Sequence, residues 1–291
     1  MSKKKEYKIK DMPQLCFGLV NHFEDNFEKN LNKAIDKGYR HFDGAEVSNY
    51  GPKNLVKKAF SKIERTDFWL TWKREKISYT EVQKIIKELE CEYIDLFLIH
   101  FSCGQINDYN ELNKCRKEGL IRFWGVSNCE DYSEILKLKY NYDIYANQIQ
   151  ARPPGGEVKG RKKLDEDFVK NCNDIGVKIM LFGTNSGVSE SLLYYENIEL
   201  FDYFIDEQNK QFINKYYKQK YINQQNGNVL IVSSMVGTSI DNNYGEFYNE
   251  ENYLIFLYLN FIFLAKLIKD YNKKKMEEFE SNILKLVLSR Q

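Results

Sequence analysis

Three side chains with acid–base chemistry end three successive apolar segments of the chain. Asp43 stands near the end of "YRHFDGA", Lys73 ends "DFWLTWK", and His100 ends "YIDLFLIH". Tyr50 follows Asp43 by seven residues, just before a glycine and a proline. If the three segments are neighbouring strands, their ends lie close together, because parallel strands are about 4.8 Å apart. A carboxylate, an ammonium group, an imidazole and a phenol that converge are suited to proton transfer to a substrate oxygen.

These residues also have an ordinary structural explanation, because a charged residue at a strand end is usually a solvated cap. If they converge, the ammonium lowers the pKa of the phenol from its usual value of about 10, and the carboxylate keeps the lysine charged. The imidazole can hydrogen-bond the substrate oxygen or relay a proton. No serine or cysteine stands beside a base, and the cysteines and histidines show no metal-ligand spacing. A dissociable hydride carrier would therefore supply the electrons.

The elements that must position these side chains are short apolar runs that alternate with helix-like segments. Runs that are almost continuously apolar are typical of strands buried on both faces, as in a parallel sheet. The expected strands are 14–20, 39–45, 67–73, 94–100, 122–128, 144–150, 177–183 and 229–237. The expected helices are 25–37, 54–63, 79–91, 108–119, 131–140 and 164–176. Gly38, Gly119 and Gly176 stand where glycine caps of helix C-termini belong.

Eight such units predict an α/β fold, a single (β/α)8 TIM barrel over residues 1–291 with a helical C-terminal tail over about 244–291. An open, doubly wound sheet is the alternative. A GxGxxG turn after the first strand would favour it, and "CFGLVN" has no such turn. The segment 206–228 fits the barrel least well.

In such a barrel the active site lies at the C-terminal ends of the strands. The ends of the later strands carry residues that can bind a ligand: Ser127 and Asn128, Asn147 and Gln148, Phe182 and Gly183, and Gly237, Thr238 and Ser239. The segment "ARPPGGEVKGR" follows the sixth strand and contains Arg152, Lys159 and Arg161. It forms either a solvated loop or a contact to an anionic group.

At this point the chain resembles a known family, the aldo-keto reductases, which are NAD(P)H-dependent (β/α)8 barrels. The matching segments over about residues 10–250 are "GYRHFDGA", "YGPKNLVKKAF", "DFWLTWK", "YIDLFLIH", "EGLIRFWGVSN", "ANQIQ" and "VGTS". The resemblance implies a catalytic tetrad of Asp43, Tyr50, Lys73 and His100. It implies cofactor contacts at Ser127, Asn128 and Gln148, at Phe182 and Gly183, and at Gly237, Thr238, Ser239 and Asn243.

The chain departs from the family pattern in three places. The usual spacing is D-x-A-x-x-Y, whereas two extra residues separate Asp43 from Tyr50 and place Ser48 at the usual tyrosine position. The segment "GTSIDNNYGEF" lacks the basic residues that usually bind the 2′-phosphate of NADP, so NADPH is expected and NADH stays open. The loop after the fourth strand, "FSCGQINDYNEL", is short.

The leading functional prediction is an oxidoreductase that transfers hydride between NAD(P)H and a small aldehyde or ketone, with Tyr50 as general acid or base. The first alternative is a cofactor-binding regulatory or interaction barrel with little turnover. The second is an isomerase or lyase barrel without nicotinamide, for which "LFGTNSG" offers only a weak phosphate-binding loop.

The composition and the apolar segments of the chain indicate which binding partners and which cellular compartment to expect. The net charge of +1, from 43 basic and 42 acidic residues, gives no electrostatic reason to expect nucleic acid or an anionic membrane. The start "MSKKKEYKIK" lacks the apolar core of a signal peptide, so a cytoplasmic protein with free thiols is expected. The apolar run 253–268 is shorter than a membrane span of roughly 20 residues. It is expected to pack on the barrel or on a second subunit, with a membrane or partner helix as the alternative.

Overall fold

The strands form a closed barrel in the order of the chain, and every neighbouring pair is parallel. The computed structural model describes residues 7–20, 27–48, 50–150, 165–182 and 229–232. The strands are β1 (Leu15–Gly18), β2 (His41–Ala45), β3 (Trp69–Arg74), β4 (Ile94–Ile99), β5 (Ile121–Ser127), β6 (Ala146–Gln150), β7 (Lys178–Phe182) and β8 (Val229–Val232). The predicted barrel is therefore confirmed, and the doubly wound alternative is excluded.

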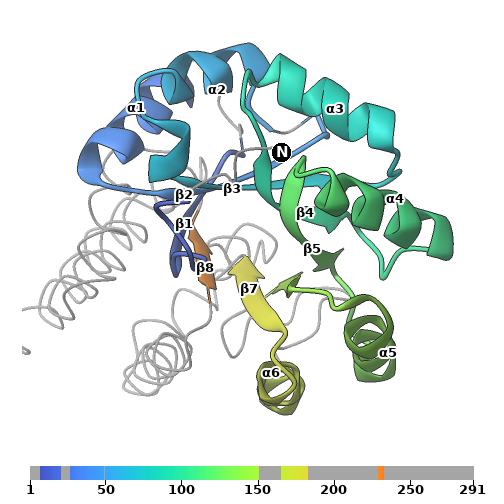
Figure 1. Cartoon of the computed structure of the whole chain (residues 1–291). Helices are drawn as coiled ribbons and strands as arrows, with labels where there is room; N and C mark the ends of the chain where they lie inside the picture. Colours follow the sequence, from blue (N-terminus) through green and yellow to red (C-terminus); the bar gives the residue numbers. More distant parts are fainter. Residues whose placement is uncertain (1–6, 21–26, 49, 151–164, 183–228, 233–291) are drawn as a thin grey trace, which may run out of the picture. The chain divides into compact units, whose positions relative to one another are not determined.

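Helices connect the consecutive strands from β1 to β7 and lie outside them (Figure 1). They are α1 (Phe27–Lys37), α2 (Lys53–Phe60), α3 (Tyr79–Glu88), α4 (Ile106–Lys117), α5 (Tyr132–Tyr142) and α6 (Glu166–Asp174), and a short 3-10 helix, η2, spans Arg65–Asp67. Each predicted helix up to residue 176 is confirmed, with ends that differ by a few residues. The starts follow capping rules, since Ser78 accepts from the backbone N–H of Glu81 and Asp165 from that of Phe168.

Glycines end three of these helices in a left-handed conformation, as the sequence predicted. The φ angles of Gly38, Gly119 and Gly176 are 106°, 73° and 75°. A side chain at such a φ clashes with the backbone, so glycine turns the chain back toward the next strand at least cost.

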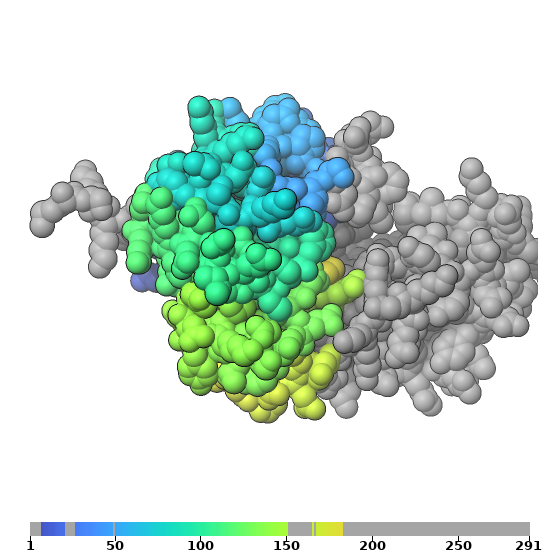
Figure 2. Space-filling view, turned by 90° about the vertical axis from the view of Figure 1, so that its right-hand side faces the viewer, coloured from blue at the N-terminus to red at the C-terminus, as the bar shows by residue number. Residues whose placement is uncertain are grey.

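Large side chains pack together in the barrel interior. A buried cluster joins residues from before β1 to β7: Met12, Cys16, Trp69, Leu96, Leu98, Ala146 and Met180. The three tryptophans, Trp69, Trp72 and Trp124, are at most 1% exposed. On the outside, the space-filling view shows segments from blue through green lying side by side in chain order (Figure 2).

A buried ionic cluster joins the N-terminal ends of β3, β4 and β5. Asp95, 1% exposed, accepts from Arg122 at 2.6 Å, from Arg65 at 2.5 Å and from the backbone N–H of Leu70 at 2.8 Å. Arg122 also donates to the carbonyl of Ile9, which fastens the segment before β1 to this end of the barrel. The carboxylate thus compensates two guanidinium groups that would otherwise be buried without an anion.

We expect Asp95→Asn to lower the free energy of unfolding by about 3–5 kcal/mol, because it leaves two largely buried cations without their anion. Urea unfolding followed by circular dichroism measures the change. Asp174→Asn is the matched control, since Asp174 pairs with Lys170 on the exposed face of α6. Equal stabilities of the two variants would contradict a structural role for the Asp95 cluster.

Several predicted features lie outside the described residues. They are the helical tail of about 244–291, the apolar run 253–268, the segment 206–228 and the loop with Arg152, Lys159 and Arg161. All described residues belong to one compact unit. Among them, no helix combines the length and apolar character needed to cross a membrane.

Candidate active site

An ion pair between Lys73 and Asp43 stands at the C-terminal ends of β3 and β2. The two strands pair in register, with Asp43 opposite Thr71 and Ala45 opposite Lys73. The ammonium donates to Oδ2 of Asp43, and the two side chains are only 1% and 2% exposed. Burial lowers the pKa of Lys73, but the Asp43 carboxylate and Tyr50 outweigh it, so that the net pKa is raised. Lys73 is therefore a buried cation at neutral pH.

Gln148 forms a hydrogen bond with the other oxygen of the Asp43 carboxylate. Its Nε2 donates to Oδ1 of Asp43 at 2.9 Å, and its side chain is 3% exposed. The hydrogen bond joins β6 to β2 across the barrel. It also fixes the amide orientation and leaves the Gln148 oxygen as the atom that can accept from a ligand.

Tyr50 lies beside Lys73 despite the two extra residues in its loop. The loop bends in a turn in which the Tyr50 N–H donates to the carbonyl of Val47 at 3.1 Å. Tyr50 then pairs with Val20 after β1, and the next N–H, of Gly51, donates to Leu19 at 2.8 Å. The Lys73 ammonium is 5.0 Å from the Tyr50 ring centroid.

Ser48, which stands at the usual tyrosine position, is exposed. The extra residues are thus absorbed by the turn, and the backbone pairing holds Tyr50 at the end of the barrel.

The pKa of Tyr50 is raised, and the predicted net lowering by Lys73 is wrong. Burial of the phenol raises the pKa most, the charge of Lys73 lowers it, and the charge of Asp43 raises it again. The prediction considered the lysine without the low-dielectric surroundings. Tyr50 is consequently a protonated phenol at neutral pH, and the charge of the neighbouring Lys73 favours the phenolate form.

His100 is a neutral imidazole after β4. Burial, and then the charge of Lys73, lower its pKa from 6.5 to about 4. The side chain is 7% exposed, its ring stacks on Phe101, and Nδ1 has no hydrogen-bond partner within the described part of the chain. A buried polar atom normally has a partner, so this nitrogen is available to a ligand. The imidazole can donate one hydrogen bond and accept another without carrying charge.

We expect the imidazole of His100 to stay neutral from pH 8 down to about pH 5 and to titrate near pH 4. A folded pKa below the unfolded value of about 6.5 means that stability is lost as pH falls below 6.5 toward 4, because the unfolded chain binds the proton first. Nitrogen-15 NMR of the ring follows the titration, and His100→Gln assigns the signal. A midpoint above pH 6 would contradict the burial argument.

The residues predicted to contact a nicotinamide amide are brought together at the ends of β5 and β6. Ser127 pairs with Gln148 in the sheet, and the Asn128 N–H donates to the Gln148 carbonyl at 2.7 Å. Asn128 has a φ of 63° and donates its side-chain amide to the Ser127 hydroxyl at 3.3 Å. Asn147 donates instead to the carbonyl of Cys129 at 2.7 Å, so it supports the loop after β5.

Phe182 is the last residue of β7, half-buried and packed against the interior cluster. The remaining predicted cofactor contacts lie outside the described residues: Gly183, Gly237, Thr238, Ser239 and Asn243. The described part of the site therefore covers the end that would hold a nicotinamide ring.

Two of the six cysteines form a disulfide, so the expectation of free thiols is wrong for this pair. Cys103, in the loop after β4, is bonded to Cys129, in the loop after β5, and their Cα atoms are 4.9 Å apart. The adjacent strands bring these loops together, which a separation of 26 residues in sequence does not reveal. The other cysteines are free: Cys16, Cys91, Cys115 and Cys172.

The described residues fit a nicotinamide carboxamide. Such a group needs a hydrogen-bond acceptor for its NH2 and donors for its oxygen. Gln148 presents its amide oxygen, while the Ser127 hydroxyl and the Asn128 amide can donate. No spacing pattern in the sequence marks Glu46, the first residue after β2, whose carboxylate accepts from Lys53 at the start of α2.

A parallel barrel with a buried Lys–Asp pair and a tyrosine at its C-terminal end defines a class of (β/α)8 oxidoreductases. The model of the Aldo/keto reductase family matches residues 15–233, and the chain belongs to this family. A Citrus sinensis (1S)-1,7-diacetoxy-luvungin A aldo-keto reductase is 27% identical in an alignment of 216 residues that covers 61% of this chain and 65% of the relative.

Two further relatives are each 30% identical. One is a rat 3-alpha-hydroxysteroid dehydrogenase, with 48% of this chain and 55% of the relative covered. The other is the methylglyoxal reductase DkgA of Escherichia coli O157:H7, with 49% and 55% covered. The chain thus matches between about half and two thirds of the length of these relatives.

Solved structures share the fold over most of the chain. Aldose reductase from Giardia lamblia has a TM-score of 0.62 at 17% identity, with 96% of this chain and 94% of that one covered. An aldo-keto reductase from a Medee basin deep-sea metagenome library has a TM-score of 0.61 at 19% identity, with 94% and 92% covered.

Proposed function

We propose that the protein is an NAD(P)H-dependent reductase of small aldehydes or ketones, with Tyr50 as general acid. The observation that carries the proposal is the placement of a protonated Tyr50 beside the buried Lys73–Asp43 pair, at the end of the barrel where Gln148 and Ser127 meet. The names of the curated relatives, a steroid dehydrogenase and a methylglyoxal reductase among them, support the same reaction class.

The proposed chemistry divides between hydride and proton. A bound nicotinamide supplies hydride to the carbonyl carbon, and the developing charge on the carbonyl oxygen must be neutralised. Tyr50 donates its proton to that oxygen, and Lys73 stabilises the phenolate that remains. A raised phenol pKa suits this direction, because the acid stays protonated until an alkoxide, a far stronger base, forms.

His100 and Asp43 have supporting roles in the proposal. The neutral imidazole hydrogen-bonds the substrate oxygen without adding a second cation near Lys73, and so leaves the proton transfer to the phenol. Asp43 keeps Lys73 charged and holds Gln148 in the orientation that a carboxamide requires. After the product leaves, the Tyr50 phenolate takes up a proton from the solvent.

We expect Tyr50→Phe to lower kcat by roughly 10²- to 10⁴-fold, because the ring stays while the proton donor is lost. Steady-state reduction of a panel of small aldehydes, followed by nicotinamide absorbance, measures kcat, and cofactor affinity should change little. Ser48→Ala is the matched control in the same loop, with unchanged turnover expected. Wild-type turnover in Tyr50→Phe together with a loss in Ser48→Ala would assign the proton to the serine instead.

The other members of the site predict a graded series in the same assay. Lys73→Met should be impaired about as severely as Tyr50→Phe, because it removes the cation that stabilises the phenolate. Asp43→Asn should fall between these variants and wild type, since Asp43 acts through Lys73. His100→Gln should retain part of the activity, because an amide can replace the neutral hydrogen bond. An undiminished Lys73→Met would remove the electrostatic basis of the proposal.

We expect the protein to bind NADPH stoichiometrically and more tightly than NADH. The usual cofactor preference of the family favours NADPH. The absence of basic residues in "TSIDNN", which would bind the 2′-phosphate, argues against this preference. Calorimetric titration with each cofactor measures both dissociation constants. Equal or tighter NADH binding would show that the 2′-phosphate has no specific contact, and no heat with either cofactor would refute the proposed function. Gln148→Leu should weaken both cofactors, because each carries the same carboxamide.

A further inference from the structure

The segment that carries Tyr50 is closed at its base by an ion pair. Glu46 is the first residue after β2, and Lys53 is the first residue of α2. The Lys53 ammonium donates to both carboxylate oxygens of Glu46, at 3.1 and 2.8 Å. The two ends of a loop with two extra residues are thereby held together, and Tyr50 lies between them.

The same carboxylate is tied to the strand that carries Lys73. Trp72 donates its indole N–H to Oε1 of Glu46 at 2.9 Å, and Arg74 approaches Oε2 at 3.7 Å. Successive side chains of a strand point to opposite faces, so the neighbours of Lys73 meet Glu46 on the outside of β3. The backbone adds a further link, since the Glu46 N–H donates to the Lys73 carbonyl at 2.9 Å.

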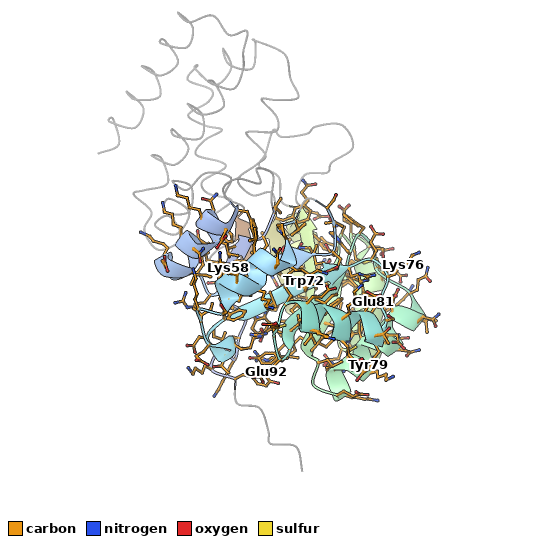
Figure 3. All side chains as sticks on the ribbon, turned by 90° about the horizontal axis from the view of Figure 1, so that it is seen from above. Lys58, Trp72, Lys76, Tyr79, Glu81 and Glu92 are labelled. Atoms are coloured by element: carbon orange, nitrogen blue, oxygen red, sulfur yellow. A yellow bond between two sulfur atoms is a disulfide. The ribbon has the colours of Figure 1, made fainter. Side chains whose placement is uncertain are left out.

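The surroundings of Glu46 make these contacts stronger than an ordinary surface pair. The side chain of Glu46 is 16% exposed, and those of Lys53 and Arg74 are 28% exposed. The indole that donates to it is 1% exposed, and its ring lies on Gly44, where an added Cβ would be 2.2 Å from the ring. Figure 3 views the barrel from the side of α2 and α3 and labels Trp72 and Glu81.

We propose that Glu46 is a positioning residue that fixes Tyr50 relative to Lys73 and so compensates for the lengthened loop. It does not touch the reacting atoms. Through Lys53 it holds both ends of the Tyr50 loop. It also accepts a hydrogen bond from Trp72 and forms an ion pair with Arg74, the residues before and after Lys73. This inference rests on the proposed function, because the distance that it sets is that between the proton donor and its cation.

The loss expected on removal of Glu46 follows from the geometry of proton transfer. A misplacement of about 1 Å at a reacting group can cost about 100-fold in rate. Glu46→Ala should therefore lower kcat by roughly 10- to 100-fold and leave cofactor affinity unchanged. Glu46→Gln should recover part of the loss, because its amide oxygen still accepts from Trp72, whereas Lys53 keeps only its ion pair with Glu88.

The matched control is Glu81→Gln. Glu81 forms an ion pair with Nη2 of Arg74 at 3.1 Å, and its side chain is 33% exposed. In the described contacts it pairs with neither Lys53 nor Trp72. The variant removes one carboxylate from the same face of the barrel and leaves the Tyr50 loop closed. We expect wild-type kcat from it.

A second readout tests the loop without relying on turnover. The amides of Tyr50 and Gly51 donate to Val47 and Leu19, so hydrogen–deuterium exchange of peptides that cover 46–53 reports whether the loop is held. Exchange should be faster in Glu46→Ala than in wild type or Glu81→Gln, with the rest of the barrel unchanged.

The combined results decide the inference. A fall in kcat with faster exchange only in 46–53, and partial rescue by Glu46→Gln, supports it. Unchanged exchange, or faster exchange with unchanged kcat, overturns it, as does exchange that is faster throughout the barrel in Glu46→Ala. If the wild-type protein reduces no carbonyl, the proposed function fails, and the exchange comparison alone decides whether Glu46 positions Tyr50.

Discussion

The buried ion pair between Lys73 and Asp43 is the interaction on which the rest of the site depends. Neither charge would remain in a barrel interior alone, because desolvation of one unpaired ion costs several kcal/mol. Together they are at most 2% exposed. The lysine charge then acts on both neighbours. Burial raises the pKa of Tyr50 and the lysine charge opposes that effect, whereas burial lowers the pKa of His100 and the lysine charge adds to it. Burial keeps the phenol protonated and, together with Lys73, keeps the imidazole neutral.

Backbone geometry decides which residue of the lengthened loop reaches this pair. Gly51 must lie flat against the ring of Phe27, since an added Cβ would be 1.9 Å from a ring atom. Together with the pairing of Tyr50 with Val20, this packing fixes the end of the loop and forces the extra residues outward. Ser48 is exposed for that reason, while Tyr50 stays beside Lys73.

The barrel and most of the described site could be predicted from the sequence because both follow from local patterns. Apolar runs of strand length gave all the strands, and the polar residues that end them include Asp43, Lys73 and Ser127. Contacts between distant segments left no such pattern. The hydrogen bond from Gln148 to Asp43 joins residues 105 positions apart, and the Cys103–Cys129 disulfide depends on two loops being neighbours. The pKa of Tyr50 was mispredicted because burial, which outweighs Lys73 there, is a property of the folded chain.

The placement of the tryptophans has a consequence for spectroscopy. The chain has three of them, all in β3 or β5 and all shielded from water, whereas its 21 tyrosines are spread along the sequence. Tryptophan emission should consequently be blue-shifted in the native protein and move to the red only when the barrel opens. Tryptophan emission therefore reports on the barrel alone. Far-ultraviolet circular dichroism, in contrast, reports on the whole chain. A difference between the two melting curves would show that secondary structure is lost in a step separate from the opening of the barrel.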